Sequence, residues 1–356
     1  MQTELILDAK ATLGEGPAWD AKTQTLYWVD ILEKRIYAGV ELLAQLDDLI
    51  GCLAPRKNGN LILGLSGAES RASFVDFAPD SSRQTVLAAL SESATNRVND
   101  GKCDPAGRFL AGTMDMNETD PNGSFYSFDG KTTQTLFSGV TISNGLAWSP
   151  DHKTFYYIDT PTREVKAFDY DVSTGQIANP RAVIHFPEPL GWPDGMTSDM
   201  DGNLWIAMWG GAQVTKWNPN SSTLLEQVAI PALQSSACVF GGKDRNELYV
   251  TSARKGMSEA DLKKYPLSGG LFKVVTKVEG MPTFEFGLRK KKEERILSSF
   301  FFNHQSVFVS SIISLHCSPD NPTNGEFSTT VSRFSTINTR ASSLNVCECH
   351  TPHFML

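Results

Sequence analysis

The amino-acid sequence predicts an all-β protein, a six-bladed β-propeller, on the strength of three observations. A short apolar strand pattern recurs six times, every 35 to 49 residues. A polar turn rich in Gly, Pro, Asp and Asn precedes each copy, as hairpins require. No long amphipathic helix pattern interrupts the series. Four short strands about every 45 residues are typical of a propeller blade.

The repeated strand reads LYWVD at residues 26–30 and returns at residues 61–65, 109–113, 155–159, 204–208 and 248–252. It is a continuous apolar run rather than an alternation, which predicts sheets packed face to face. Most tryptophans are therefore expected between blades. Only Trp192 and Trp209 are candidates for the wall of a pocket.

Two segments compete to close the ring. Residues 4–8 precede the first unit and residues 283–287 follow the sixth, and either could add the strand that completes an open blade. We place the propeller in residues 1–288. The tail, residues 289–356, opens with a basic run (RKKKEER) and becomes rich in Ser, Thr, Asn and Phe. We expect a disordered extension or a gene-model artefact, and we assign the tail no function.

Composition narrows the class of protein. Hydrophobic residues make up 40% of the 356-residue chain, and the net charge of −8 argues against nucleic acid as a partner. No apolar run reaches the length of a membrane helix, and the first residues do not resemble a secretory signal. The spacing of the six cysteines does not indicate a disulfide framework. We expect a cytoplasmic protein with reduced thiols, no membrane association and no implied protein partner.

Four oxygen-bearing side chains stand at equivalent places in the repeat. Glu15, Asn99, Asn144 and Asp194 are separated by about two, one and one repeat lengths. Equivalent residues of innermost strands surround the axis of a propeller, so these side chains are expected to point into one end of a central tunnel. Two carboxylates and two amide carbonyls suit one hard divalent cation such as Ca²⁺, Mg²⁺ or Mn²⁺, with Zn²⁺ as a further candidate.

A turn is the simpler explanation for any one of these Asn-Gly or Asp-Gly pairs. The repeat spacing of all four is what favours a site. The other two units are expected to present Ala54-Pro55 and Ala237-Cys238 at this position.

The motifs also resemble those of a known family. LGEGPAWD (13–20), RVNDGKCDPAGRFLAGTMD (97–115), ISNGLAWSPD (142–151) and WPDGMTSDMDGNLWIAMW (192–209) are similar, in order, to motifs of the family of senescence marker protein-30 (regucalcin), gluconolactonases and the luciferin-regenerating enzyme. The closing VEGMPTFEFG (278–287) extends the resemblance over residues 1–288. The resemblance implies a six-bladed propeller with a single divalent metal ion in its central channel.

The resemblance also implies roles for individual residues. It makes Glu15, Asn144 and Asp194 metal ligands, and it makes Asn99 a more distant ligand or a substrate contact. Arg97 matches the arginine that holds substrate hydroxyls.

The roles of two further residues, Glu118 and Asp100, are implied less directly. The family's acidic substrate contact is expected after the GTM segment, where Glu118 is available although a strict count reaches Asn117, which leaves sugar specificity open. Asp100 is expected either to support the ligands from behind or only to shape its turn.

The favoured function is a divalent-metal-dependent hydrolase that opens a small, sugar-type lactone. A divalent ion polarises a carbonyl and lowers the pKa of bound water. Asp194 is the candidate general base, with a role as ligand only weighed equally. A non-catalytic calcium-binding or regulatory propeller and a phosphotriesterase-like hydrolase are the alternatives. The propeller region contains only His152 and His185, which argues against a mechanism based on a histidine pair.

Overall fold

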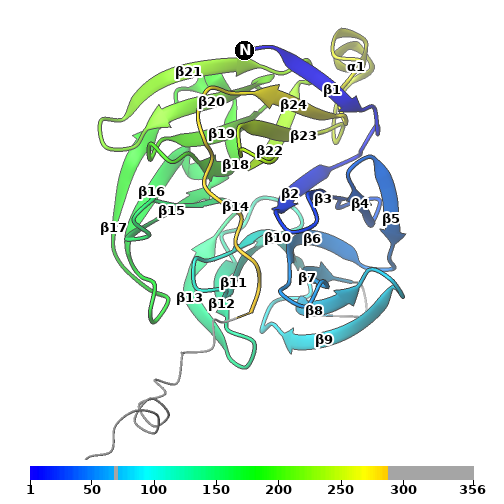
Figure 1. Cartoon of the computed structure of the whole chain (residues 1–356), viewed down its shortest axis with the longest axis vertical. Coiled ribbons are helices and arrows are strands. Elements are labelled where there is room, and N and C mark those ends of the chain that lie inside the picture. Colours follow the sequence, from blue (N-terminus) through cyan, green and yellow to red (C-terminus); the bar gives the residue numbers. More distant parts are fainter. Residues whose placement is uncertain (68–70, 288–356) are drawn as a thin grey trace, which may run out of the picture. The chain divides into compact units, whose positions relative to one another are not determined.

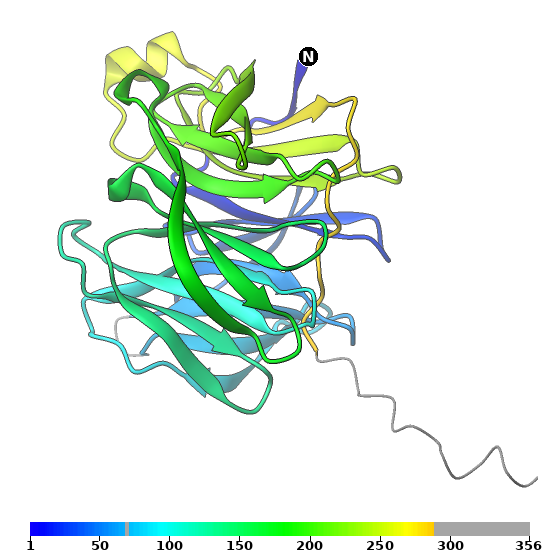
Figure 2. The same cartoon turned by 90° about the vertical axis from the view of Figure 1, so that its left-hand side faces the viewer.

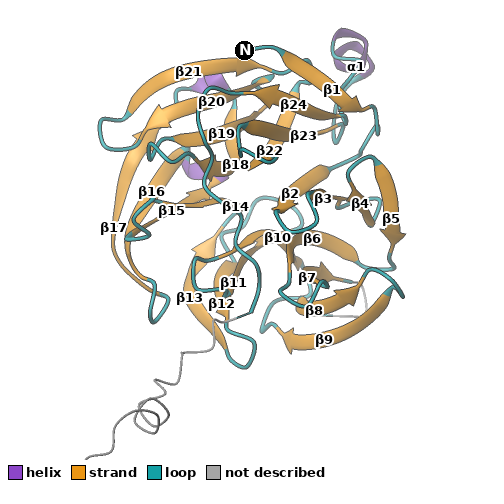
Figure 3. Cartoon of the chain, viewed as in Figure 1, coloured by secondary structure: helices purple, strands orange, loops and turns teal. Residues whose placement is uncertain are grey.

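The computed structural model describes residues 1–67 and 71–287. These residues form six four-stranded antiparallel sheets arranged around a common centre, a six-bladed β-propeller as predicted (Figure 1). Within this described part of the chain, helix is confined to one short α-helix and two 3-10 turns (Figure 3). The predicted tail lies outside the described residues.

The first three sheets run from the innermost to the outermost strand in chain order. The first contains β2 (Gly14–Asp20), β3 (Thr25–Asp30), β4 (Arg35–Ala38) and β5 (Glu41–Gln45). The second contains β6 (Leu49–Pro55), β7 (Leu61–Ser66), β8 (Ser73–Ala78) and β9 (Arg83–Ala89). The third contains β10 (Asn96–Cys103), β11 (Phe109–Asp115), β12 (Gly123–Phe128) and β13 (Thr133–Val140).

The remaining sheets follow the same plan until the last. The fourth contains β14 (Ser143–Trp148), β15 (Thr154–Asp159), β16 (Glu164–Asp171) and β17 (Gln176–His185), with the 3-10 turn η1 (Thr160–Thr162) between β15 and β16. After η2 (Glu188–Leu190), the fifth contains β18 (Trp192–Ser198), β19 (Leu204–Trp209), β20 (Gln213–Asn218) and β21 (Thr223–Ala229). The sixth contains β22 (Gln234–Gly241), β23 (Glu247–Ala253), β24 (Leu271–Val275) and β1 (Thr3–Leu7), with helix α1 (Glu259–Lys264) between β23 and β24.

The ring is closed by β1, the first of the two predicted segments. Strand β1 pairs antiparallel with β24, so the sixth sheet contains strands from both ends of the propeller. The alternative, residues 283–287, is wrong as a closing strand because its only pairing is an isolated bridge between Arg56 and Phe286.

Residues 276–287 instead form a strap across one end of the ring. The strap is tied to three sheets: Met281 N–H donates to Ser198 O at 2.9 Å, Phe286 N–H to Pro55 O at 2.8 Å, and Gly287 N–H to Gly107 O at 2.9 Å. Figure 2 shows it running along one side of the ring, away from α1. The strap therefore covers one end of the central channel.

Large side chains fill the space between sheets, as the apolar repeat predicted. Trp28 and Trp205 are among the largest fully buried side chains of the described residues. Phe74 of the second sheet meets Phe109 of the third edge to face, with ring centroids 5.2 Å apart. Such packing fixes each innermost strand against its neighbours and so fixes the side chains around the axis.

Two expectations from composition can be compared with the described residues. No helix within them is long and apolar enough to cross a membrane. The three cysteines among them, Cys52, Cys103 and Cys238, are buried and free.

Candidate active site

A β-bulge interrupts every innermost strand at the same level of the ring. The register shifts lie between Glu15 and Ala18, Ile50 and Cys52, Val98 and Gly101, Asn144 and Leu146, Pro193 and Met196, and Ser235 and Ala237. A bulge adds a residue to one strand, bends it and turns a side chain out of the regular alternation. The bulges thus explain how side chains at equivalent places in different sheets can turn toward the axis.

The four predicted ligands lie at or beside these bulges. In the other two innermost strands the shift falls at Gly51 and Ser236, so these residues occupy the equivalent positions. The expected Ala54 and Ala237 are wrong, because spacing along the chain does not show where the extra bulge residue sits.

Six predicted site residues line one cavity of about 570 Å³: Glu15, Asn99, Asn144, Asp194, Arg97 and Glu118. Glu15 and Asp194 are 7% and 4% exposed, so this end of the cavity holds two carboxylates largely removed from solvent. Burying two like charges together is unfavourable unless cations or hydrogen bonds compensate them.

Hydrogen bonds compensate the buried charges of Glu15 and Asp194 only in part. Oδ1 of Asp194 is buried without a hydrogen-bond partner among the described residues. Within residues 1–67 and 71–287, Oε2 of Glu15 accepts only a 3.0 Å hydrogen bond from the neighbouring Gly16 N–H. Burial, followed by the negative charge of Asp100, raises the pKa of Glu15 to about 8. Burial, followed by the charge of Glu15, raises the pKa of Asp194 well above its usual value.

The amide side chains belong to a hydrogen-bonded chain that links three sheets. Asn99 Nδ2 donates to Asn144 Oδ1 at 2.9 Å and to Ser143 O at 2.7 Å. Asn144 Nδ2 donates to Thr160 Oγ1 at 2.8 Å, and that hydroxyl donates to Pro193 O at 2.8 Å. These hydrogen bonds fix the orientation of the Asn144 amide, whose oxygen accepts from Asn99.

Thr160 was missed by sequence reasoning. It begins η1, outside the repeated strand motif, and only the fold brings it beside the strand that carries Asp194. No motif in the sequence marks it.

Arg97 is buried at the wall of the cavity, and its Nη1 donates to Val98 O at 3.1 Å. Burial lowers the pKa of Arg97, and the carboxylates of Glu118, Glu15 and Asp194 oppose that effect. A guanidinium suits the role predicted for Arg97, because its planar fork of donors can hold substrate oxygens.

Glu118 and Lys255 form an ion pair that crosses between sheets. Glu118 follows β11 of the third sheet, Lys255 follows β23 of the sixth, and both line the cavity. Counting round a ring of six, these two sheets face each other. The pair therefore spans the cavity rather than running along one wall. Lys255 was not predicted, since a lysine outside every motif gives no signal until the fold places it opposite an acid.

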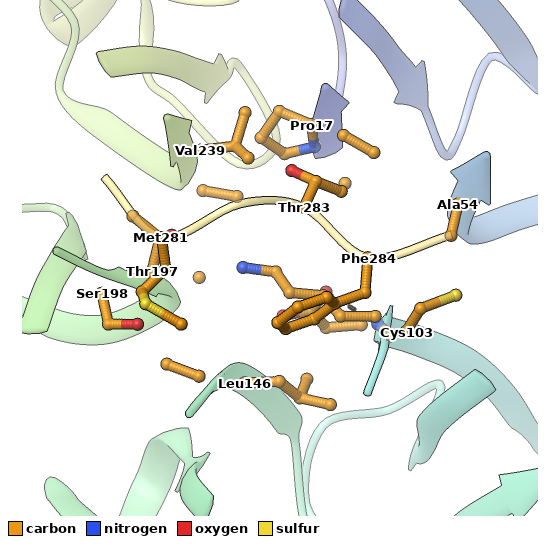
Figure 4. Close-up of a pocket in the computed structure, with 18 of the residues that line it drawn as sticks. Pro17, Ala54, Cys103, Leu146, Thr197, Ser198, Val239, Met281, Thr283 and Phe284 are labelled. Carbon is orange, nitrogen blue, oxygen red and sulfur yellow. Dashed lines mark hydrogen bonds between the residues drawn. The ribbon is translucent and has the colours of Figure 1, made fainter. Parts of the chain in front are cut away.

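Asp100 lies on a second, smaller cavity beneath the strap. This cavity is also lined by Lys102, Met281 and Phe284, and Figure 4 shows the last two in the segment that crosses it. Gly101 N–H donates to Asp100 Oδ1 at 2.7 Å, while Oδ2 is buried without a partner among the described residues. Asp100 thus acts on the larger site through its charge, which raises the pKa of Glu15 and Asp194.

The residues fit a hard divalent cation. No group of three or more His, Cys, Asp or Glu side chains in residues 1–67 and 71–287 is arranged to hold a metal, so a site based on thiolates or imidazoles is not available there. Glu15 and Asp194 with the Asn144 carbonyl give an all-oxygen set, which Ca²⁺ and related ions prefer. The unpartnered Asp194 oxygen is the atom that most needs a cation.

The fold and site define a propeller with oxygen-bearing side chains gathered in one cavity. A family model described as the SMP-30/Gluconolactonase/LRE-like region matches residues 13–254. The chain belongs to this family.

Individual relatives agree with this assignment. Regucalcin of Danio rerio is 38% identical over 295 residues, which cover 80% of this chain and 98% of the relative. A luciferin-regenerating enzyme has a similar structure, with a TM-score of 0.74, 33% identity, and coverage of 81% of this chain and 99% of that one. A calcium-binding protein, regucalcin, from Agrobacterium tumefaciens has a TM-score of 0.73, 26% identity, and coverage of 80% and 97%.

Proposed function

We propose that this protein is a divalent-metal-dependent hydrolase that opens a small lactone. The observation that carries the proposal is the buried, unpartnered Asp194 carboxylate oxygen beside Glu15, facing a cavity of about 570 Å³. Membership of a family whose description includes gluconolactonase supports a lactonase-type enzyme. A site built for structure alone would not leave a carboxylate uncompensated next to an open cavity.

Glu15, Asn144 and Asp194 would hold the ion, with Asn99 as a further ligand or a contact to substrate. When bound, the ion supplies a polarised carbonyl and a more acidic water. Calcium is the first ion to test, because one structural relative is described as calcium-binding, and zinc, manganese and magnesium follow.

The side chains of the cavity account for the proton transfers. Lactone opening adds water to the carbonyl carbon, breaks the bond from that carbon to the ring oxygen, and delivers a proton to the ring oxygen. Asp194 accepts the proton of the attacking water through the carboxylate oxygen that does not hold the ion and returns it to the leaving oxygen. Arg97 and Asn99 orient substrate oxygens through their N–H groups, and Glu118 accepts from a substrate hydroxyl when it is released from Lys255.

A regulatory calcium-binding propeller is the second candidate, favoured by the names of the regucalcin relatives. It predicts tight metal binding without turnover. For either function we propose a cytoplasmic setting and a free small-molecule ligand, in keeping with the three buried, free thiols.

Proton release from a panel of aldonolactones and other lactones tests the proposal. The full chain is stripped with a chelator and reloaded with each divalent ion in turn. We expect turnover with at least one ion and a loss of at least about 100-fold in Asp194→Asn, the scale of a general base. Asp47→Asn, an exposed aspartate outside the cavity, is the matched control and should behave as wild type.

Metal binding measured by calorimetry on the same proteins separates the alternatives. Tight binding with no turnover of any lactone would establish the regulatory candidate. Full metal affinity and full turnover in Asp194→Asn would contradict the site itself. If the wild type turns over a lactone and Asp194→Asn does not, while the variant keeps its metal affinity, Asp194 is a base rather than only a ligand.

A further inference from the structure

Part of the cavity lining is apolar and makes no use of the chemistry described above. This apolar lining comes from residues on or beside four of the six sheets, and its members are Leu13, Met114, Ile142, Pro161, Trp192 and Trp209. Apart from the two indole N–H groups and the weakly accepting sulfur of Met114, these side chains offer no hydrogen-bond donors or acceptors to a hydroxylated ligand.

Trp192 is the unusual member of this apolar lining because its side chain is left open to solvent. Its exposed fraction is 44%, whereas Trp28 and Trp205 are 1% exposed. It pairs with Trp209 in the register of β18 and β19, and both residues line the cavity. Exposure of a large aromatic side chain on a cavity wall indicates a ligand-binding role.

The indole of Trp192 is also braced from outside the cavity. The Arg163 guanidinium lies over it, 4.3 Å from the ring centroid. Three carbonyls hold that guanidinium in place: Arg163 Nε donates to Phe186 O at 3.1 Å, and Nη2 donates to Pro187 O at 3.1 Å and Gly191 O at 2.7 Å. An indole held in this way loses little conformational freedom when a ring stacks on it.

The chain enters Trp192 through a turn that only glycine allows. Gly191 has a φ of 93°, and a Cβ there would lie 2.6 Å from the Trp209 carbonyl oxygen. The backbone path into Trp192 is therefore constrained at Gly191, while Arg163 lies against the indole itself.

We propose that Trp192, braced by Arg163, is a specificity-determining residue that stacks on an apolar or aromatic ring of the substrate. The preferred substrate is then a lactone that carries such a ring, rather than a fully hydroxylated aldonolactone. A small sugar lactone would contact Arg97 and Asn99 but would leave the Trp192 indole exposed to water. A cavity of several hundred Å³ suits a larger, drug-sized ligand. This inference rests on the proposed lactonase activity for its substrate class, although ring binding by Trp192 is separable from turnover.

The test uses the full chain loaded with the metal that gives the highest activity. Binding of an aryl-fused lactam, the non-hydrolysed analogue of dihydrocoumarin, is followed by tryptophan fluorescence and calorimetry. Turnover of dihydrocoumarin and of gluconolactone is measured in parallel. Trp192→Ala should weaken lactam binding about threefold to tenfold, the worth of one aromatic contact. The ratio of kcat/KM for the aryl lactone over gluconolactone should fall by the same factor.

Three further variants make the result specific. Trp192→Phe keeps an aromatic ring and should recover most of the lactam affinity. Arg163→Met keeps the indole but removes its brace, and should give an intermediate loss. Leu225→Ala, which removes a side chain 49% exposed on the outermost strand β21, is the control and should change neither quantity.

Equal effects of Trp192→Ala on the aryl lactone and gluconolactone would overturn the inference, as would undiminished lactam binding. Failure of the proposed function gives a different pattern: Trp192-dependent lactam binding without turnover of any lactone. In that case ring binding by Trp192 is supported and the lactonase activity is not.

Discussion

Replacement of Glu15 by glutamine should stabilise the metal-free protein at high pH. Burial and the charge of Asp100 raise the pKa of Glu15 from 4.5 to about 8 in the folded state. The folded chain therefore keeps a proton that the unfolded chain releases. Because the folded state binds more protons between these two pH values, its stability falls as the pH rises from about 4.5 to about 8.

The size of the effect follows from the pKa. At about 1.4 kcal/mol per pH unit, the raised pKa corresponds to roughly 5 kcal/mol of lost stability above pH 8. Glu15→Gln removes the charge but keeps the shape. In chelator at pH 9 it should raise the free energy of unfolding by up to that amount, and at pH 4 by almost nothing. With metal present the sign should reverse, because the variant lacks a ligand and loses the stabilisation that binding provides.

Urea unfolding from pH 4 to pH 9, with chelator and with saturating metal, measures both effects. Glu226→Gln, an exposed glutamate on β21, is the matched control and should follow wild type throughout. A Glu15→Gln curve parallel to wild type at every pH in chelator would refute the account of Glu15 as a carboxylate buried without compensation.

Three further changes test other parts of the structure. Thr160→Val breaks the link from Asn144 to the fifth sheet and should weaken metal binding about 10-fold to 100-fold by calorimetry, so unchanged affinity would contradict it. Lys255→Met should lower the free energy of unfolding by less than about 1 kcal/mol, since the pair with Glu118 is partly exposed; a double-mutant cycle with Glu118→Gln giving a larger coupling would show a stronger role. Deletion of residues 1–8 should cost several kcal/mol, at about 1 kcal/mol per lost backbone hydrogen bond, and should promote self-association through the bared edge of β24; a stable monomer in gel filtration would argue against closure by β1.

The fold was predictable because its signals are local and repeated. The six LYWVD-like runs all fall within the second strand of a sheet, from β3 to β23. Each needs only its own turn and its own apolar run, so neighbouring residues carry the information. Closure was ambiguous for the opposite reason. Both β1 and residues 283–287 are short segments of strand-like composition, and only the free edge of β24 decides between them.

The site was predictable where residues share the repeat and unpredictable where they do not. Glu15, Asn99, Asn144 and Asp194 could be grouped because equivalent positions in a propeller surround one axis. Thr160 and Lys255 come from connections between strands, and contacts made by such connections to other sheets leave no periodic trace in a sequence. Asp100 directly follows Asn99, yet the bulge between Val98 and Gly101 directs it to the smaller cavity beneath the strap.

The pairing of β1 with β24 has a consequence for how the chain is made. On the ribosome, β1 emerges before any other strand, while its partner emerges after all the other sheets. The first strand must therefore wait without a partner through the synthesis of five and a half blades, and β22 to β24 present a bare edge until it docks. Such late, sequence-distant pairing slows folding and prolongs exposure to wrong partners. We expect the nascent chain to need protection most at this last step, when the circle is complete except for one strand.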